Sequence, residues 1–250
     1  MTEPAIRFTE VTFQYPDGFR ALDNVSLTIQ PGEKVGIIGP NGAGKSTLLL
    51  HLNGVLRAAG GTVSVHGIEV GKKTLRQVRQ MVGVVFQDPD DQLFSTTVAE
   101  DVAFGPRNLG LPEPQVAERV REALSLVGLA DFASRLPQHL SFGQKKRVAI
   151  ATVLSMQPRV WAFDEPTANL DPQSQAAVEQ FIASRADTVL VVTQDLSFVA
   201  EVCARVIVLA AGRVAYDGAL EELFDRPDLM REHGLAFERH CRACARIRRA

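Results

Sequence analysis

The sequence predicts an α/β fold with a largely parallel, doubly wound sheet and a helical block inserted into it. Short apolar runs alternate with helical patterns in the first and last thirds of the chain, which is typical of parallel sheets flanked by helices. Between about residues 87 and 157 the strand patterns disappear, so we expect a helical insertion there. A length of 250 residues accommodates one such domain with its insertion.

The strands expected in the first ninety residues are apolar or alternating runs bounded by turn residues. They are 6–8, 11–15, 25–29, 35–38, 62–66 and 82–86. The run at 35–38 leads directly into glycines, as a buried strand entering a tight loop does. Leucines near helical spacing predict a helix over 46–55, and a basic amphipathic stretch covers 72–80.

In the second half of the chain, an amphipathic pattern that begins beside two prolines predicts a helix over 113–127. The alternation of strands and helices then resumes. The expected strands are 160–163, 188–192 and 206–209, and the expected helices are 173–185 and 198–204.

Composition indicates an ordinary globular protein, with 46% hydrophobic and 22% charged residues. A net charge of −2 is too close to zero for a general nucleic-acid binder, so we expect no nucleic-acid partner. Three cysteines form no disulfide framework and indicate a reducing compartment. The first residues lack a signal-peptide pattern, and no apolar run approaches the ~20 residues that cross a bilayer. We therefore expect a cytosolic chain that could still serve a membrane.

A phosphate-binding loop is predicted between the strand at 35–38 and the helix after it. The segment 39–47, GPNGAGKST, matches the pattern G-x-x-x-x-G-K-[ST] in the required strand–loop–helix context. Backbone N–H groups of such a loop converge on phosphates, the lysine reaches the β- and γ-phosphates, and the following hydroxyl ligates Mg²⁺. The alternative is a purely structural glycine-rich turn. The predicted nucleotide-binding residues are Gly39, Asn41, Gly42, Gly44, Lys45, Ser46 and Thr47.

A second motif, VWAFDE at 160–165, supplies carboxylates. Asp164 ends an apolar strand, where a carboxylate can hold Mg²⁺ at the carboxyl edge of a parallel sheet. Glu165 follows directly and can act as the general base toward an attacking water. The alternative is an acid that caps a helix starting near Pro166. Together the two motifs predict a nucleoside triphosphatase or a kinase.

Four further features narrow this class of proteins. The pentapeptide LSFGQ at 140–144 resembles the LSGGQ signature of ATP-binding cassette (ABC) proteins, and Gln87 matches the Q-loop glutamine of that family. The segment 168–171, ANLD, resembles the D-loop, and Tyr15 stands where the family places the aromatic that stacks on adenine. From residue 6 to about residue 216 the chain resembles an ABC nucleotide-binding subunit.

The resemblance implies a P-loop NTPase fold of the ABC ATPase type. It comprises a mostly parallel RecA-like core sheet, an N-terminal antiparallel β subdomain and a helical subdomain inserted at about 87–157. The ATPase domain is then 1–230, followed by a basic helical tail at 231–250. The implied activity is ATP hydrolysis coupled to transport, with ATP and Mg²⁺ bound.

The resemblance also implies residue roles in a head-to-tail dimer. Ser141, Gly143 and Gln144 lie in the signature that contacts the γ-phosphate held by the opposite chain. Gln87 belongs with Ser46 and Asp164 around Mg²⁺ and links that site to the helical block. Asp171 of the D-loop belongs to the dimer contact.

Two positions depart from the family pattern. Phe142 replaces the first signature glycine, and its ring either crowds the ATP sandwich or points away; the preserved neighbours Ser141 and Gly143 favour the second. Gln194 replaces the switch histidine that touches the γ-phosphate and the attacking water. A glutamine can orient a water but carries no positive charge, so we expect slower hydrolysis.

Within the family, the segments 84–94 and 102–110 resemble energy-coupling-factor (ECF) importers, and the chain is most similar to the ATPase subunit of cobalt and nickel importers. Such subunits pair with a second copy or a related ATPase. They sit on the cytoplasmic face of the cell membrane beneath a membrane coupling protein, which works with a substrate-binding membrane component. Gln92, Leu93 and Phe94 are expected to line the coupling groove; an ordinary apolar patch is the alternative.

Other functions stay open at this stage. The ATPases of vitamin-transporting ECF importers resemble those of the metal importers, so a vitamin importer is an alternative. Because of Gln194, a nucleotide-gated module with little ATP turnover is another alternative. ABC ATPases acting on DNA or ribosomes usually carry two cassettes or a long coiled coil, which this sequence lacks. In the tail, His233, His240, Cys241 and Cys244 suggest a metal site, but a docked or frayed helix, or contact with anionic lipid, are alternatives. Cys203 is expected to be a small core residue.

Overall fold

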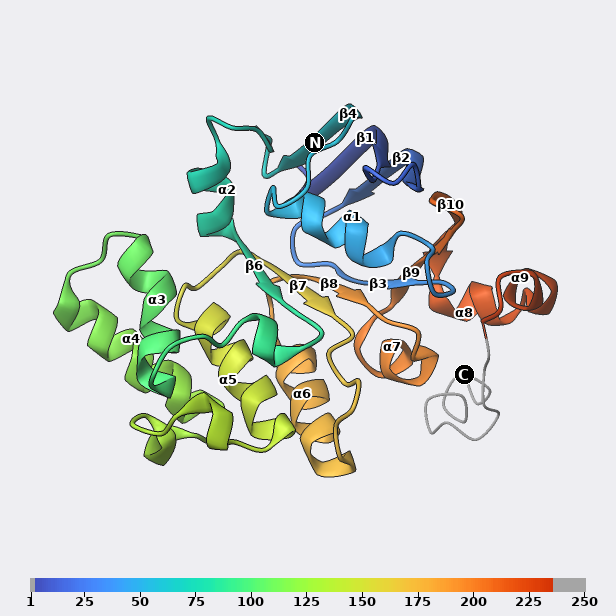
Figure 1. Cartoon of the computed structure of the whole chain (residues 1–250). Helices are drawn as coiled ribbons and strands as arrows, with labels where there is room; N and C mark the ends of the chain where they lie inside the picture. Colours follow the sequence, from blue (N-terminus) through green and yellow to red (C-terminus); the bar gives the residue numbers. More distant parts are fainter. Residues whose placement is uncertain (1–2, 236–250) are drawn as a thin grey trace.

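The computed structural model describes residues 3–235, which form two sheets and the helices that cover them (Figure 1). The first sheet is antiparallel. In spatial order it consists of β2 (Arg20–Ile29), β1 (Ile6–Gln14), β4 (Gly60–Val65) and β5 (Ile68–Glu69). The second sheet consists of β10 (Arg213–Ala219), β9 (Arg205–Ala210), β3 (Lys34–Ile38), β8 (Thr188–Val192), β7 (Val160–Asp164) and β6 (Val82–Val85).

The second sheet is parallel from β9 to β6, and β10 alone runs antiparallel at its edge. This agrees with the mostly parallel core and the N-terminal antiparallel sheet expected from the sequence. Strands β7 and β8 are buried at every position because both faces of the sheet are covered, which explains their unbroken apolar runs.

One helix, α1 (Lys45–Leu52), lies between the two sheets (Figure 1). The inward side chains of β1, β2 and β3 form one core with Leu48, Leu49 and Leu52 of this helix. On the opposite face of the parallel sheet, α6 (Pro172–Ser184) and α7 (Leu196–Val202) complete a second core. Successive residues of β8 alternate between these cores, with Leu190 in the first and Val191 in the second.

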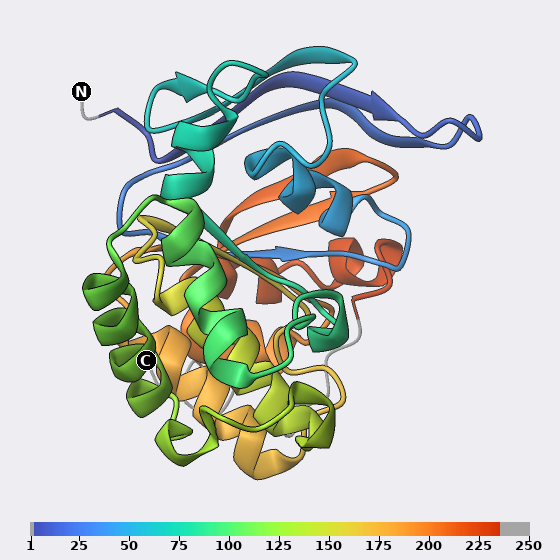
Figure 2. The ribbon, with the colours of Figure 1, turned by 60° about the vertical axis from the view of Figure 1, so that its left-hand side comes forward.

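The chain between β6 and β7 is helical, as the sequence predicts. It contains α3 (Val98–Asn108), α4 (Glu113–Leu126) and α5 (Phe142–Leu154), with short turns η1 (Pro89–Asp91), η2 (Ala130–Phe132) and η3 (Pro137–His139). Figures 1 and 2 place α3 and α4 at the outside of the molecule, whereas α5 contacts both of them and strand β6. Helix α5 is therefore the physical link between the helical block and the parallel sheet.

The remaining helices are α2 (Leu75–Met81), α8 (Leu220–Phe224) and α9 (Pro227–Glu232). None of the helices within residues 3–235 is long and apolar enough to cross a membrane. The predicted tail at 231–250 reaches beyond the described residues, and the metal, lipid and docking hypotheses for His240, Cys241 and Cys244 lie outside them. Cys203 is buried, and burial raises the pKa of its thiol to about 12, which fits the expected core position.

Element boundaries differ from the sequence prediction where backbone irregularity or capping intervenes. The runs at 6–8 and 11–15 belong to one strand, β1, whose register shifts at a bulge where Glu10 adopts φ 52°. Helix α7 begins at Leu196, two residues early, because the Asp195 carboxylate accepts the N–H groups of Ser197 and Phe198. Strand β10 and the helices α3, α8 and α9 were not predicted.

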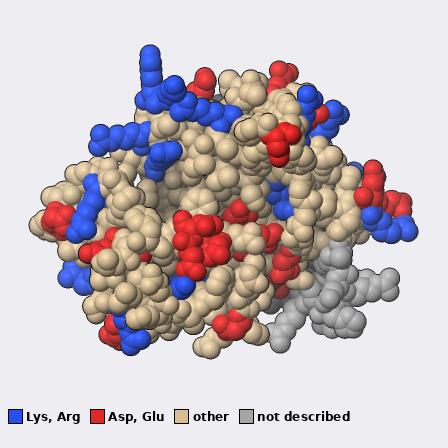
Figure 3. Space-filling model, in the orientation of Figure 1, with Lys and Arg blue, Asp and Glu red and all other residues tan. Residues whose placement is uncertain are grey.

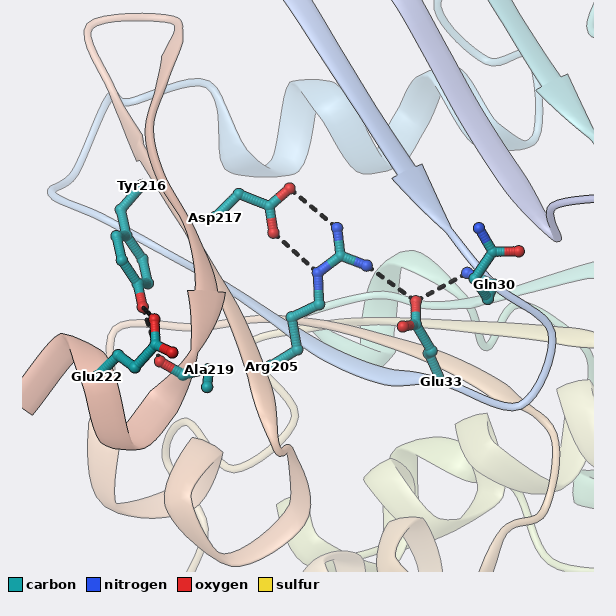
Figure 4. A network of polar contacts seen from close by, with 7 residues as sticks. All are labelled: Gln30, Glu33, Arg205, Tyr216, Asp217, Ala219 and Glu222. Atoms are coloured by element: carbon teal, nitrogen blue, oxygen red, sulfur yellow. Dashed lines mark hydrogen bonds and ion pairs between the residues drawn. The ribbon is translucent and has the colours of Figure 1, made fainter.

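An ion-pair network joins the turn after β2 to the edge of the parallel sheet (Figure 4). The guanidinium of Arg205 on β9 donates to Glu33 at 2.9 Å and to both carboxylate oxygens of Asp217 on β10 at 2.8 and 2.9 Å. Glu33 also accepts the N–H of Gln30 at 2.7 Å. The network holds the turn that leads into β3. Strand β3 in turn leads into the predicted phosphate-binding loop.

Candidate functional site

The predicted phosphate-binding loop connects β3 to α1 and packs closely against the backbones of β9 and β2. Gly39 has φ 150°, and a Cβ added there would lie 2.0 Å from the carbonyl oxygen of Leu209 on β9. Gly44 has φ 99°, and its Cβ would lie 2.2 Å from the carbonyl oxygen of Ala21 on β2. Both positions therefore require glycine, because the backbone approaches other strands too closely for a side chain.

This loop forms one wall of a cleft of about 350 Å³. The other walls come from segments far apart in the sequence: Gln87 after β6, Glu165 after β7 and Gln194 after β8. The complete lining is Phe19, Asn41, Gly42, Ala43, Gly44, Lys45, Ser46, Thr47, Gln87, Glu165 and Gln194. The structure thus brings together most of the residues for which the sequence predicted phosphate, water and cation contacts; Gly39 and Asp164 do not line the cleft.

The side chain of Lys45 is held inside the loop by two backbone carbonyl groups. Its side-chain nitrogen donates to the carbonyl oxygens of Gly39 at 2.9 Å and Pro40 at 3.0 Å, and the residue is 7% exposed. Burial lowers the pKa of this ammonium group, while the nearby carboxylates of Glu165 and Asp164 act in the opposite direction. The two carbonyl oxygens are neutral acceptors, so they balance the positive charge of the ammonium group only in part.

Asp164 and Ser46 meet at the carboxyl end of β7. The Ser46 hydroxyl donates to Asp164 Oδ1 at 3.1 Å, and the carboxylate is buried. Burial raises the pKa of Asp164, opposed by the Ser46 hydrogen bond and by the charges of Lys146 and Lys45. A buried carboxylate next to a hydroxyl provides the oxygen donors that Mg²⁺ prefers, so these two residues fit that ion.

Glu165 is oriented by the neighbouring strand. Its backbone, at φ 41°, donates an N–H to Val192 O at 2.8 Å, and its Oε2 accepts a hydrogen bond from the Thr193 hydroxyl at 2.8 Å. The alternative interpretation, a helix cap near Pro166, is wrong, because the next helix begins at Pro172. Gln194 follows the fully buried Thr193 and exposes its side chain in the cleft.

Tyr15 lies beside the cleft and does not line it. Its hydroxyl is 3.0 Å from the Thr47 hydroxyl, and its ring packs edge-on against Phe13 at 4.9 Å. Phe19 does line the cleft and is 51% exposed, a contact that sequence reasoning missed. The phenylalanine at position 19, in the turn between β1 and β2, was the available signal, because turns are built mainly from Gly, Pro, Asn, Asp and Ser.

The signature segment stands apart from this cleft. Ser141 caps α5 through a reciprocal box: its hydroxyl accepts the N–H of Gln144 at 3.3 Å, and Gln144 Oε1 accepts the N–H of Ser141 at 3.0 Å. Ser141 is exposed and Phe142 is half-buried in the first turn. None of residues 140–144 lines the cleft that holds Lys45.

Asp171 caps α6 and lies next to the signature. Its carboxylate accepts the N–H groups of Gln173 and Ser174, each at 3.0 Å, and the Ser174 hydroxyl at 2.7 Å. The Ser174 hydrogen bond lowers the pKa of Asp171. A Cβ on Gly143 would lie 2.4 Å from Ser174 Oγ, so the signature glycine permits close packing of α5 on α6.

Two of the three predicted groove residues face elsewhere. Gln92 accepts the N–H of Phe86 at 3.1 Å and donates to Ala149 O and the Thr152 hydroxyl at 2.8 and 2.7 Å. Leu93 is buried in the core. The expectation that both line a groove is wrong because the turn η1 directs them inward, toward α5.

Phe94 alone of the three lines a groove. It is 66% exposed and packs edge-on against Phe104, itself 50% exposed, with ring centroids 4.9 Å apart. The groove has a volume of about 550 Å³ and is lined by Phe94, Ser95, Thr96, Glu100, Phe104, Arg107 and Asn108. Beside it, Figure 3 shows acidic side chains gathered over η1, where Asp88, Asp90 and Asp91 are exposed.

A glycine-rich loop between a buried strand and a helix, with a lysine inside it and an aspartate at the end of a nearby parallel strand, defines a P-loop nucleoside triphosphatase. The chain belongs to the ABC transporter family, because the sequence model described as "ABC transporter" matches residues 22–168. Close relatives support the same family and its energy-coupling-factor group.

One such relative is the energy-coupling factor transporter ATP-binding protein EcfA of Methanothermobacter thermautotrophicus, 44% identical over 98% of this chain and 80% of the relative. Among solved structures, CbiO1 of Clostridium perfringens, part of the ABC transporter complex CbiONQ, is 37% identical with a TM-score of 0.79 and covers 94% of this chain and 96% of that one. A dimeric bacterial ABC transporter cassette, MJ0796, is 30% identical with a TM-score of 0.79 over 86% of this chain and 98% of that one. The chain is therefore an ABC-type, ATP-binding ATPase subunit of the energy-coupling-factor kind.

Proposed function

We propose that this chain is the motor subunit of an importer for divalent cobalt or nickel ions, acting as a head-to-tail pair of cassettes that closes on two MgATP molecules. The observation that carries the proposal is the division of the site. The P-loop and Glu165 share one cleft, and Asp164 adjoins it through its hydrogen bond with Ser46, whereas the signature helix has its N-terminus elsewhere. One chain therefore holds half of each ATP site, and a second cassette completes it.

The signature half is built to receive an anion. The capping box of Ser141 and Gln144 occupies the N3 and N-cap N–H groups, leaving the amides of Phe142 and Gly143 at the first turn of α5. Such amides and the positive end of the helix favour a phosphate. This supports roles for Ser141, Gly143 and Gln144 against the partner's ATP and for Asp171 at the contact between cassettes.

In the P-loop half, Lys45 and the loop amides bind the β- and γ-phosphates, and the Tyr15 ring stacks on the adenine. Ser46 and Asp164 would hold Mg²⁺, with Gln87 in the same cleft as Ser46, and the ion would offset the negative charge of the phosphates. The roles of Lys45 and the loop amides are supported by the cleft lining, and those of Ser46 and Asp164 by the hydrogen bond between them. The role of Tyr15 is supported by the sequence resemblance alone, because its ring lies beside the cleft.

The reaction is hydrolysis of the terminal phosphoanhydride. Gln194 orients a water, and Glu165, held by Thr193, accepts a proton from it as the oxygen attacks the γ-phosphorus. The bond from the γ-phosphorus to the bridging oxygen breaks, and its electron pair leaves with ADP. Loss of the γ-phosphate removes the bridge to the partner's signature, and the pair opens.

We assign the membrane connection to the groove around Phe94 and Phe104. An exposed aromatic pair preceded in the chain by the exposed Asp88 and Asp91 suits a helix that offers apolar and basic side chains, as an integral membrane coupling protein would. The chain then binds peripherally at the cytoplasmic face of the membrane, with a substrate-binding membrane component completing the importer. The choice of cobalt or nickel as the cargo rests on the sequence resemblance alone.

The decisive experiment is uptake by the assembled complex captured through this chain. Cells carrying the complex are assayed for ATP-dependent accumulation of cobalt, nickel and a vitamin such as biotin, with Glu165→Gln as the matched inactive control. We expect metal uptake that the control abolishes. Uptake of the vitamin alone would replace the proposed cargo and leave the motor function intact, whereas capture without any membrane protein would overturn the transport role.

A second candidate, a nucleotide-gated module with little turnover, is favoured by Gln194 alone. This neutral side chain lies in the cleft where a charged histidine is the family pattern. ATPase assays of the assembled complex distinguish the two: turnover comparable to that of other importers excludes the module, and turnover equal to that of Glu165→Gln supports it.

A further inference from the structure

One buried charge has no role in the mechanism above. Lys146 lies in the middle of α5, five residues after Ser141, and is 0% exposed. Lysine is among the residues least often buried without a partner, because removing an ammonium group from water is costly. Its burial therefore requires partners that repay this cost.

Lys146 finds these partners on the backbone of the Q-loop. Its side-chain nitrogen donates to the carbonyl oxygen of Phe86 at 2.8 Å and to that of Gln87 at 2.9 Å. The carboxylates of Asp164, Asp88 and Glu165 favour the charged form, although burial lowers the pKa of the group to about 8. The ammonium thus joins the signature helix to the residue that lines the ATP cleft.

Two neighbouring side chains bind the same segment, residues 86–92, to the same helix. Lys145 pairs with Asp90 at 2.7 Å. Gln92 donates to Ala149 O and to the Thr152 hydroxyl. Of the three attachments, only that of Lys146 acts on the backbone of Gln87 itself, and only its charged group is fully buried.

We propose that Lys146 is a positioning residue that couples the two halves of the ATP machinery within one chain, by holding the Gln87 backbone to the helix whose N-terminus carries the signature. Residues 86–92 and the start of α5 then move as one unit. A change at Gln87 caused by the local nucleotide is transmitted along α5 to Ser141, which faces the partner's nucleotide. This inference rests on the proposed pairing of two cassettes.

The chemistry at this position selects lysine. An ammonium group on a flexible stem can direct separate N–H donors at two adjacent carbonyl oxygens. Methionine has nearly the same length and no donor, so Lys146→Met leaves both carbonyls without these bonds while filling the space. Arginine retains several donors, so Lys146→Arg restores part of the attachment.

The test compares three variants of the full-length chain. Lys146→Met is measured beside Lys146→Arg and beside the matched control Lys145→Met, which removes the adjacent, partly exposed ammonium from the same helix. Hydrogen exchange of residues 86–93 reports the attachment itself and needs no dimer. The dissociation constant for ATP and the kcat of hydrolysis then separate nucleotide binding from coupling. Thermal unfolding confirms that each variant folds.

For Lys146→Met we expect faster exchange over 86–93, a dissociation constant for ATP within about twofold of the parent, and a kcat lowered by about ten- to a hundredfold, as misplacing a catalytic assembly by about 1 Å does. Lys146→Arg should recover part of the kcat. Lys145→Met should lower it by less than about threefold, because a partly exposed ion pair contributes little.

Unchanged exchange and kcat in Lys146→Met would overturn the proposal, and so would a rise in the ATP dissociation constant that accounts for the whole loss. If Lys146→Met does not fold, the same criteria apply to Lys146→Gln, whose shorter amide cannot reach both carbonyls. A parent chain that neither hydrolyses ATP nor responds to Glu165→Gln would instead contradict the proposed function, and the exchange experiment would still decide the attachment.

Discussion

The two halves of the ATP machinery are built differently within the same chain. Around the P-loop, Lys45 and Asp164 are buried, and Gly39 lies against the backbone of a neighbouring strand. At the start of α5, Ser141 is exposed and held only by its own capping box. The first region is held by contacts within the chain, whereas the second has an exposed helix N-terminus, which a second cassette would cover in the proposed pair.

The difference follows from the location of the packing. The P-loop lies between the two sheets, which share one apolar core around α1. Its geometry is therefore set by tertiary contacts within one chain. The signature and the aromatic groove belong to the helical block, which faces outward in Figures 1 and 2. Changes in the first region should therefore alter chemistry or folding, and changes in the second should alter communication with partners.

The largest effect is expected for Glu165→Gln in the P-loop region. Removing the general base while keeping its size should lower kcat by about 10²–10⁴-fold. ATP binding should persist, because Lys45 and the loop amides are unchanged. Steady-state hydrolysis and equilibrium ATP binding measure the two quantities; a loss of less than tenfold would show that another group accepts the proton.

Gly39→Ala tests the packing of the P-loop region through the stability of the folded chain. A Cβ there would lie 2.0 Å from Leu209 O, so we expect about 2–4 kcal/mol lower free energy of unfolding. The matched control is Gly42→Ala, whose Cβ meets nothing within 4 Å and whose φ of 77° alone should cost about 1 kcal/mol. Urea unfolding measures both, and equal losses would contradict the claim that the loop is clamped.

Phe94→Ala probes the outward region. Loss of an exposed aromatic anchor should weaken binding of the membrane coupling protein by about 30-fold, equivalent to about 2 kcal/mol. ATP hydrolysis by the isolated chain should remain unchanged, because Phe94 lies outside the ATP cleft. Leu126→Ala, at another exposed apolar position (69%), controls for surface hydrophobicity. If both variants bind equally well, the groove is not the docking site.

Gln194→His returns a chargeable donor to the cleft. A hydrogen bond from a charged group is worth about 1 kcal/mol more than a neutral one, so turnover of the assembled complex should rise about fivefold. The rise should fade as pH increases through the histidine pKa, since the neutral ring loses the advantage. Turnover that is unchanged or lower would contradict the expectation that Gln194 slows hydrolysis.

The smallest effect is expected for Arg205→Ala, far from both regions. Arg205 is partly exposed and bridges Glu33 and Asp217, so its loss should cost at most about 1 kcal/mol, or roughly 2–4 °C in Tm. Nucleotide affinity should be retained. A large drop in ATP binding would show that the network in Figure 4 supports the P-loop more directly than its distance suggests.

Local patterns in the sequence were sufficient for much of the fold and of the site. The P-loop glycines, Lys45 and Ser46 are contiguous, and Asp164 and Glu165 follow an apolar strand, so their roles could be predicted without knowing their partners. Gln194 was predicted in this site from the family resemblance alone, and it lines the cleft because the parallel strands β7 and β8 end at one edge of the sheet. Strand β10 and helices α8 and α9 were missed because their patterns are short and their stability depends on packing against the sheet edge.

Only the tertiary structure decided where single side chains point. Gln92 and Leu93 follow the Q-loop in sequence and looked like groove residues, yet the turn η1 directs them inward, and Phe94 alone reaches the surface. Lys146 reads as one basic residue among several after the signature, yet packing of α5 against β6 buries it on two carbonyl oxygens. The physical reason is that residue type and spacing specify which chemistry is available, whereas the approach of distant backbones determines which atoms it meets.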